Sequence, residues 1–240
     1  MRRLAVLALA VPVLAACSGE QGERAEELLT RAQAAQARLT SATFDARVSF
    51  SLDRQTFGLV LDGGGYLNGR RAGDAIFTMR TEGVPSGANV DVEAVVRGGR
   101  VAMSVNGRRF SMPAPATAQR QFDWSKTMLD LARYVKEVRV HEGRVVNGEP
   151  GATITGVIDT EKLLRALAGL EPLAEAAGQA TPDLDDLLDV GDIRAAVFVA
   201  ERTGLIRSAV VSLTVEADGK KAKVDFTYRL KATNTTVPGL

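Results

Sequence analysis

The sequence predicts an α+β fold: a large curled antiparallel sheet, a half-barrel of about ten strands, with helices covering its concave apolar face. Three observations lead to this prediction. After residue 43 most of the chain consists of runs in which apolar and polar residues alternate, which is the period of a half-buried strand. Glycine-containing turn signals separate many of these runs. The remaining stretches carry leucine at three- and four-residue spacing, which is the period of a helix.

The first 16 residues have the plan of a secretory signal. Arg2 and Arg3 precede an apolar segment from Leu4 to Leu14, and small residues follow, as in signals that are cut on export. This apolar run is shorter than the roughly 20 residues that a membrane-spanning helix needs. The sequence Leu14-Ala15-Ala16-Cys17 resembles the bacterial lipobox.

Cys17 is the single cysteine of the chain, so no disulfide can form within it. The lipobox resemblance implies a cut before Cys17, a diacylglyceryl group on its thiol, and anchoring on the outer side of the cytoplasmic membrane. Two or more acyl chains anchor stably, whereas one is marginal. The alternative is a soluble secreted protein whose signal happens to contain a cysteine. We expect residues 1–16 to be the signal peptide, 17–23 a lipidated tether, and 24–240 a single domain.

The composition is that of an ordinary globular protein. The 240 residues are 45% apolar and 25% charged, which is enough to bury a full core. The chain has 30 basic and 29 acidic residues, and the signal takes away two arginines, which leaves 28 against 29 and a net charge of −1. From these totals we expect no field of one sign that would gather nucleic acid or anionic lipid.

The first element expected in chain order is a helix. Its apolar residues recur at three- and four-residue spacing and are Ala25, Leu28, Leu29, Ala32, Ala35 and Leu39. Strands are then expected from the alternation of apolar and polar residues at 43–53, 57–61, 75–79, 90–96, 101–105, 138–146, 152–158, 193–200, 205–215 and 221–232.

Short glycine motifs predict the turns between these strands. Gly98-Gly99 and Asn106-Gly107 lie between strand-like runs and are signals for tight hairpins. Asn68-Gly69 predicts a turn as well. Gly63-Gly64-Gly65 is expected to form a bend or turn, because glycine adopts backbone angles that other residues avoid.

Three further helices are expected between the strands. One follows Asp123 as N-cap and carries apolar residues from Met128 to Val135. The second is capped by Asp159-Thr160 and carries leucines from Leu163 to Leu173, and the third opens at Thr181-Pro182, with proline at the first helical position. The leucine ridges of these helices are expected to cover the sheet.

The apolar face of the sheet is the candidate ligand site. A curled sheet of this size can enclose more volume than its own side chains fill, but the leucine helices can also fill the concavity and leave an ordinary core. The pattern of residues leaves both open. The residues that would line a cavity are Phe50, Leu59, Leu61, Phe77, Met79, Val92, Val101, Met103, Leu163, Leu167, Val211 and Phe226.

A family resemblance favours the cavity. Four segments carry this resemblance: VEAVVRGGRVAMSVNGRRF from Val92 to Phe110, GVIDTEKLL from Gly156 to Leu164, ERTGLI from Glu201 to Ile206, and NTTVP from Asn234 to Pro238. They resemble the actinobacterial lipid-carrier lipoproteins, the group that includes carriers of lipoarabinomannan and triacylated lipids. The resemblance implies a half-barrel of antiparallel strands with helices over an apolar cavity, similar in fold to Lol-type lipoprotein carriers.

Catalytic and metal sites are not expected. His141 is the single histidine, and it is interpreted as an ordinary surface residue. With Cys17 committed to lipid, the chain has no thiol nucleophile and no zinc cluster. The acidic residues between Asp183 and Asp192 lack the glycine and glutamate of a calcium loop, and they suit a solvated helix start. We therefore expect neither an enzyme nor a cofactor.

Two functions remain from this sequence. In the first, a membrane-anchored lipoprotein binds acyl chains of a lipid or lipoglycan and carries it in the cell envelope. Its expected partners are that lipid, the membrane through Cys17, and possible transport proteins of the envelope, with no nucleic acid. The alternative is a non-catalytic envelope sensor or protein-interaction scaffold on the same fold. A cavity large enough for acyl chains favours the first, and a filled core with an exposed apolar patch favours the second.

Overall fold

The computed structural model describes residues 19–52, 55–84, 89–113, 135–159, 193–217 and 220–240. These residues form one helix and eleven strands. The elements are α1 (Glu20–Gln36), β1 (Ser41–Leu52), β2 (Gln55–Tyr66), β3 (Ala75–Glu82), β4 (Asp91–Arg97), β5 (Arg100–Val105), β6 (Arg108–Pro113), β7 (Val135–Val146), β8 (Glu149–Ile158), β9 (Ile193–Ala200), β10 (Ile206–Ala217) and β11 (Lys220–Thr233).

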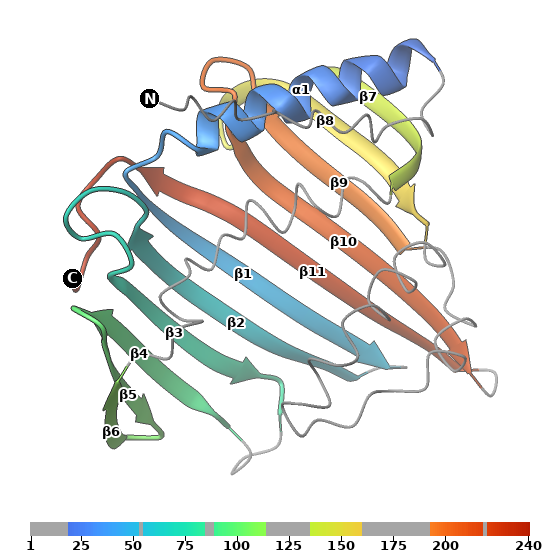
Figure 1. The fold of residues 1–240 in the computed structure, drawn as a ribbon. Coiled ribbons are helices and arrows are strands. Elements are labelled where there is room, and N and C mark those ends of the chain that lie inside the picture. The colour runs from blue at the N-terminus through green and yellow to red at the C-terminus, as the bar shows by residue number, and fades with distance from the viewer. Residues whose placement is uncertain (1–18, 53–54, 85–88, 114–134, 160–192, 218–219) are drawn as a thin grey trace, which may run out of the picture.

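The eleven strands form one antiparallel sheet with the order β6-β5-β4-β3-β2-β1-β11-β10-β9-β8-β7. Most strands that follow each other in the sequence lie side by side, and the last strand, β11, pairs with the first, β1. The edges are β6 and β7, and no pairing within the described ranges joins them, so the sheet is open (Figure 1). The prediction of a large antiparallel sheet is confirmed, and β6 is an additional strand.

Tight hairpins connect β4 to β5 and β5 to β6. The pairs Arg97↔Arg100 and Val105↔Arg108 leave two-residue loops, Gly98-Gly99 and Asn106-Gly107. All four loop residues have positive φ, between 48° and 82°, as type I′ turns require. Both predicted hairpins are confirmed.

Helix α1 lies across the sheet near β7 and β9 (Figure 1). Glu20 and Glu23 occupy its first turn, where negative charge is favourable to the helix dipole. Its buried residues Ala25, Leu28 and Ala32 follow the helical period and join a core cluster with residues of the sheet. The predicted N-terminal helix is therefore confirmed, but its bounds differ. It begins at Glu20, so residues 20–23, which were expected in the tether, belong to it. It ends at Gln36, so Leu39, which was expected on its apolar face, lies beyond it.

The expected bend at Gly63-Gly64-Gly65 is wrong, because all three glycines lie within β2. They are needed for close packing instead. A Cβ on Gly63 would lie 2.7 Å from Cδ1 of Phe77 and 3.2 Å from Cζ of Phe44. Gly63 therefore makes room for two aromatic rings from the neighbouring strands.

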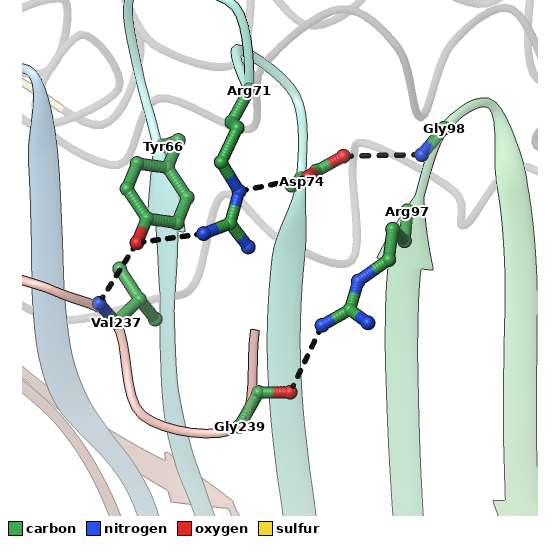
Figure 2. A network of polar contacts seen from close by, with 7 residues as sticks. All are labelled: Tyr66, Arg71, Asp74, Arg97, Gly98, Val237 and Gly239. Carbon is green, nitrogen blue, oxygen red and sulfur yellow. Dashed lines mark hydrogen bonds and ion pairs between the residues drawn. The ribbon is translucent and has the colours of Figure 1, made fainter.

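The C-terminal segment folds back beside β2 and β4 (Figure 2). Val237 is buried, and its backbone N–H donates to the hydroxyl of Tyr66, 3.3 Å away. Arg71 lies over the Tyr66 ring, 4.2 Å from its centroid, and donates to the same hydroxyl. Arg97 donates to the carbonyl oxygen of Gly239 at 3.4 Å. These contacts tie the end of the chain to the sheet.

The helices expected around residues 123–135, 159–173 and 181–188 lie outside the described residues, except at their margins. Val135, which was assigned to the first of them, is instead the first residue of β7 and pairs with Ile158. A β-branched residue suits a strand, so that helix boundary was wrong. The cover of the sheet by these helices stays a prediction.

Candidate functional site

The sheet has one continuous apolar face. Residues directly opposite each other in an antiparallel pair point to the same side. From Ala46 on β1 the pairing runs through Leu61, Met79 and Val92 to Val105 on β5. Every position in this row is apolar, so half of the sheet presents hydrocarbon along it.

The same row continues in the other direction. Ala46 pairs with Tyr228, and the pairing runs on through Ala209, Val197 and Ile154. Ile154 pairs with Val140 on β7, the far edge. This apolar row therefore extends from β5 to the far edge, β7.

Charged side chains gather on the opposite face. Lys231 Nζ lies 2.6 Å from Oδ1 of Asp62 and 3.4 Å from Oδ2 of Asp45. The hydrogen bond to Asp62 raises the pKa of Lys231 against a smaller effect of burial. Further along β11 on the same face, the hydroxyl of Ser212 donates to Asp225 at 2.6 Å. The two faces thus differ in chemistry, as the alternation predicts.

The strand register places the described members of the predicted cavity-lining set on the apolar face. These members are Phe50, Leu59, Leu61, Phe77, Met79, Val92, Val101, Met103, Val211 and Phe226. Phe50 is 49% exposed, and the others are half-buried. Leu163 and Leu167 lie outside the described residues. That this set binds a ligand stays a prediction.

One part of the apolar face is a filled core. Under α1, the side chains of Ile154, Val199 and Ile206 are nearly inaccessible and pack against the helix. A second cluster surrounds Phe44, whose ring centroid lies 6.2 Å from that of Phe77 and 5.9 Å from that of Tyr228. These clusters account for most of the buried residues of the described part.

The other part of the face is only partly covered. No described residue of β4, β5 or β6 is buried. Val92, Val101 and Met103 are half-buried, and Phe110 and Met112 on β6 are exposed. A surface of this kind can take up hydrocarbon, because burying apolar area is favourable without any directional contact.

Sequence reasoning missed Gln36, which ends α1. Its side chain is 8% exposed, and both its Nε2 and its Oε1 lack a hydrogen-bond partner. A buried polar group without a partner costs about 1–3 kcal/mol. The helical period does place Gln36 on the buried face of the helix, because it lies one turn after Ala32 and two turns after Leu28.

Polar contacts fasten α1 to the edge strand β7. Nε of Arg24 lies 2.8 Å from Oε1 of Glu142. Hydrogen bonds to Glu27 and then to Glu142 raise the pKa of Arg24. The backbone N–H of Val140 donates to Oε1 of Gln21 at 2.8 Å. The start of the helix is therefore held at this edge of the sheet.

The described ranges contain no group of three or more His, Cys, Asp or Glu side chains that could hold a metal ion. His141 is half-buried, and its Nε2 lies 3.2 Å from the hydroxyl oxygen of Thr155. No helix in the same ranges is long and apolar enough to cross a bilayer. The acidic residues from Asp183 to Asp192 lie outside them.

Comparison with known proteins gives similarity in structure and none in sequence. No protein-family model matches the chain, and no curated protein sequence does. LprF from Mycobacterium bovis is similar with a TM-score of 0.53 and 13% identity, over 90% of this chain and 97% of that one.

Two further solved structures are more distant. The Mycobacterium tuberculosis lipoprotein LppX has a TM-score of 0.48 at 15% identity, over 88% of this chain and 97% of LppX. A LolA superfamily protein from Nitrosomonas europaea has a TM-score of 0.27 at 8% identity, over 87% of this chain and 94% of that one. The likeness to LprF carries the conclusion: the chain has the fold of LprF, and the resemblance noted in the sequence is confirmed at the level of the fold.

Proposed function

Starting from the fold shared with LprF, we propose that this protein is a membrane-anchored lipoprotein that binds the acyl chains of a lipid or lipoglycan and carries it in the cell envelope. The observation that carries the proposal is the continuous apolar face, which is only half-buried over β4 and β5. Hydrocarbon that settles on such a face leaves water with a gain of about 0.8 kcal/mol per CH₂. Long chains can therefore be held with few polar contacts, and the activity is binding without catalysis.

The anchor is the second part of the proposal. Cys17 lies three residues before the start of α1 at Glu20, so the acyl groups would hold the folded body close to the outer side of the cytoplasmic membrane. Cells fed a labelled fatty acid are expected to label the wild-type chain and not the Cys17→Ser variant. Equal labelling of both chains, or of neither, would exclude the lipobox.

We also propose that residues 24–240 are a single domain. The pairing of β1 with β11 supports this, because it joins the two ends of the chain in the middle of one sheet. Unfolding in urea is expected to follow one transition when measured by circular dichroism and by tryptophan fluorescence. Two separated transitions would contradict it.

The experiment that tests lipid binding is native mass spectrometry followed by organic extraction. It uses the full chain with Cys17→Ser, so that no covalent lipid contributes to the mass. We expect a mass excess that extraction releases as lipid. A clean protein mass that stays unchanged after incubation with diacyl lipids would exclude the carrier function and leave the sensor or scaffold.

Paired tryptophans locate the binding face. Met79 and Val92 are direct partners on the apolar face, and Met79→Trp with Val92→Trp is expected to displace lipid. Thr78 and Glu93 are direct partners on the opposite face and are both exposed. Thr78→Trp with Glu93→Trp is therefore the matched control, and it should bind lipid like the parent chain. Equal lipid content in both variants would contradict binding on the apolar face.

A further inference from the structure

The edge strand β6 ends the sheet on the side away from α1 (Figure 1). All six of its residues are exposed, and within the described part β5 is its one partner strand. Phe110 and Met112 are 47% and 43% exposed. Large apolar side chains at an open strand edge are a liability in water, so this edge is suited to a partner.

The apolar face reaches this edge without a break. Met103 on β5 pairs with Phe110, and Val101 pairs with Met112. Met103 in turn pairs with Ala94, which pairs with Phe77. Phe110 and Met112 therefore belong to the same side of the sheet as the proposed binding residues, and they form its exposed end.

Arginines surround the two exposed side chains. Arg97, Arg100, Arg108 and Arg109 are all exposed, and the segment from Arg97 to Pro113 contains no Asp or Glu. Arg97 donates to the carbonyl of Gly239, and Arg100 donates to a hydroxyl at 3.4 Å. None of these arginines forms an ion pair with a described carboxylate. Asp91 and Glu93 on β4 oppose these four arginines, so the strands β4 to β6 carry a local excess of two positive charges that the balanced net charge of the chain conceals.

These arginines lie on both sides of the edge. Arg108 pairs with Val105 and so points to the apolar face, whereas Arg109 pairs with Ser104 on the opposite side. A flat anionic surface would meet arginine on either side of two apolar side chains, which is the composition of membrane-surface segments.

We propose that this β6 edge, made of Arg108, Arg109, Phe110 and Met112 together with Arg100 on the neighbouring β5, docks on a bilayer of anionic phospholipid. The guanidinium groups bind lipid phosphates, and Phe110 and Met112 enter the acyl region. Because the apolar face continues from these two side chains, an acyl chain leaving the bilayer meets apolar side chains on β5, β4 and β3 in turn. This route for the acyl chain rests on the proposed lipid-carrier function, whereas the docking itself does not. Since α1 begins beside β7, the β6 contact is separate from the N-terminal anchor.

The test is co-sedimentation of the full chain carrying Cys17→Ser with vesicles. Vesicles of phosphatidylcholine mixed with phosphatidylglycerol are expected to bind it, and vesicles of phosphatidylcholine alone are not. Added sodium chloride should weaken the binding, because the charges are exposed. Arg108→Gln with Arg109→Gln is expected to weaken it roughly thirtyfold. Phe110→Ser with Met112→Ser should weaken it as well.

Arg139→Gln with Arg144→Gln is the matched control. Both arginines are exposed on β7, the opposite edge, and the pair removes the same charge. Equal loss in the two double variants, or equal binding to the two kinds of vesicle, would overturn the proposal. Circular dichroism of each variant excludes unfolding as the cause. If the chain carries a normal amount of lipid but the β6 and β7 double variants bind vesicles equally, the docking alone is refuted. If the chain binds vesicles but no lipid can be extracted from it, the carrier function alone is refuted.

Discussion

The two ends of the sheet share one strand pattern but have different surroundings. At the end under α1, Ile154, Val199 and Ile206 are at most 6% exposed. At the other end, Phe110 and Met112 follow the same alternation and are 47% and 43% exposed. Alternation determines which side chains share a face, but it does not determine what covers that face.

The charges of the two ends differ in the same way. Near α1, Arg207 and Glu149 form a half-buried ion pair with Nε and Oε2 2.8 Å apart, and Arg24 is paired with Glu142. At β6, Arg108 and Arg109 have no described carboxylate partner. One end uses its apolar and charged groups for stability, and the other leaves both available to a partner.

The largest expected effect is a difference in the free energy of unfolding between substitutions at the two ends of the sheet. Ile206→Ala is expected to lower the free energy of unfolding by about 2–5 kcal/mol, because it leaves a cavity under α1. Met103→Ala, on the half-buried end, should cost roughly 1 kcal/mol or less. Urea denaturation of both variants measures the difference. Similar losses would show that β5 is packed as tightly as the core.

The next effect tests the close packing at Gly63. Gly63→Ala is expected to cost about 1–3 kcal/mol, because its Cβ would press on Phe77 and Phe44. Gly58→Ala on the same strand is the control, since its Cβ would meet its nearest atom, Cβ of Glu82, at an ordinary 3.5 Å. Thermal unfolding of the two variants compares them. An unchanged melting temperature for Gly63→Ala would show that the rings can shift at no cost.

A smaller effect of opposite sign is expected at Gln36. Gln36→Leu should raise the free energy of unfolding by about 1–2 kcal/mol, because it removes a buried amide that has no partner. Gln36→Glu should lower it, because a charge would be buried in its place. Denaturant unfolding of the lipid-free chain gives both values. A loss of stability in Gln36→Leu would mean that the amide is satisfied by bound water.

The smallest effect concerns pH and the charged face. Burial favours a higher pKa for Asp225, but hydrogen bonds from Lys223 and Ser212 outweigh it and bring the pKa below 3.8. Asp225 therefore stabilises the fold above pH 3.8, and this contribution is lost as the pH falls through its folded pKa. Asp225→Asn should be less stable than wild type by at most about 1 kcal/mol at pH 7. The gap should narrow as the pH falls below 3.8, and a constant gap in urea unfolding would contradict this.

Much of the sheet was predictable because its signals are local. The hairpins at Gly98-Gly99 and Asn106-Gly107 follow from residues that accept positive φ, and the placement of Phe77 and Met103 on one face follows from period two. The interpretation of Gly63 failed for the opposite reason. Its role depends on Phe44 and Phe77, which come from two other strands.

The candidate site was predictable to a similar extent. The apolar set was found from alternation, but Gln36 was missed because a polar residue in a helix is normally exposed. The arginines around β6 were visible in the sequence as a segment without Asp or Glu. Their local charge was overlooked because the prediction used the net charge of the whole chain, which averages over regions that lie far apart.

The sequence by itself determined the strands, the tight turns, the first helix and the division of the sheet into an apolar and a polar face. These features follow from neighbours in the chain. The tertiary structure alone decided that β11 pairs with β1, that α1 covers the β7–β10 end, and that β6 is an edge whose arginines have no ion-pair partner among the described residues. Those outcomes depend on contacts between residues far apart in the sequence, and local periodicity carries no information about such contacts.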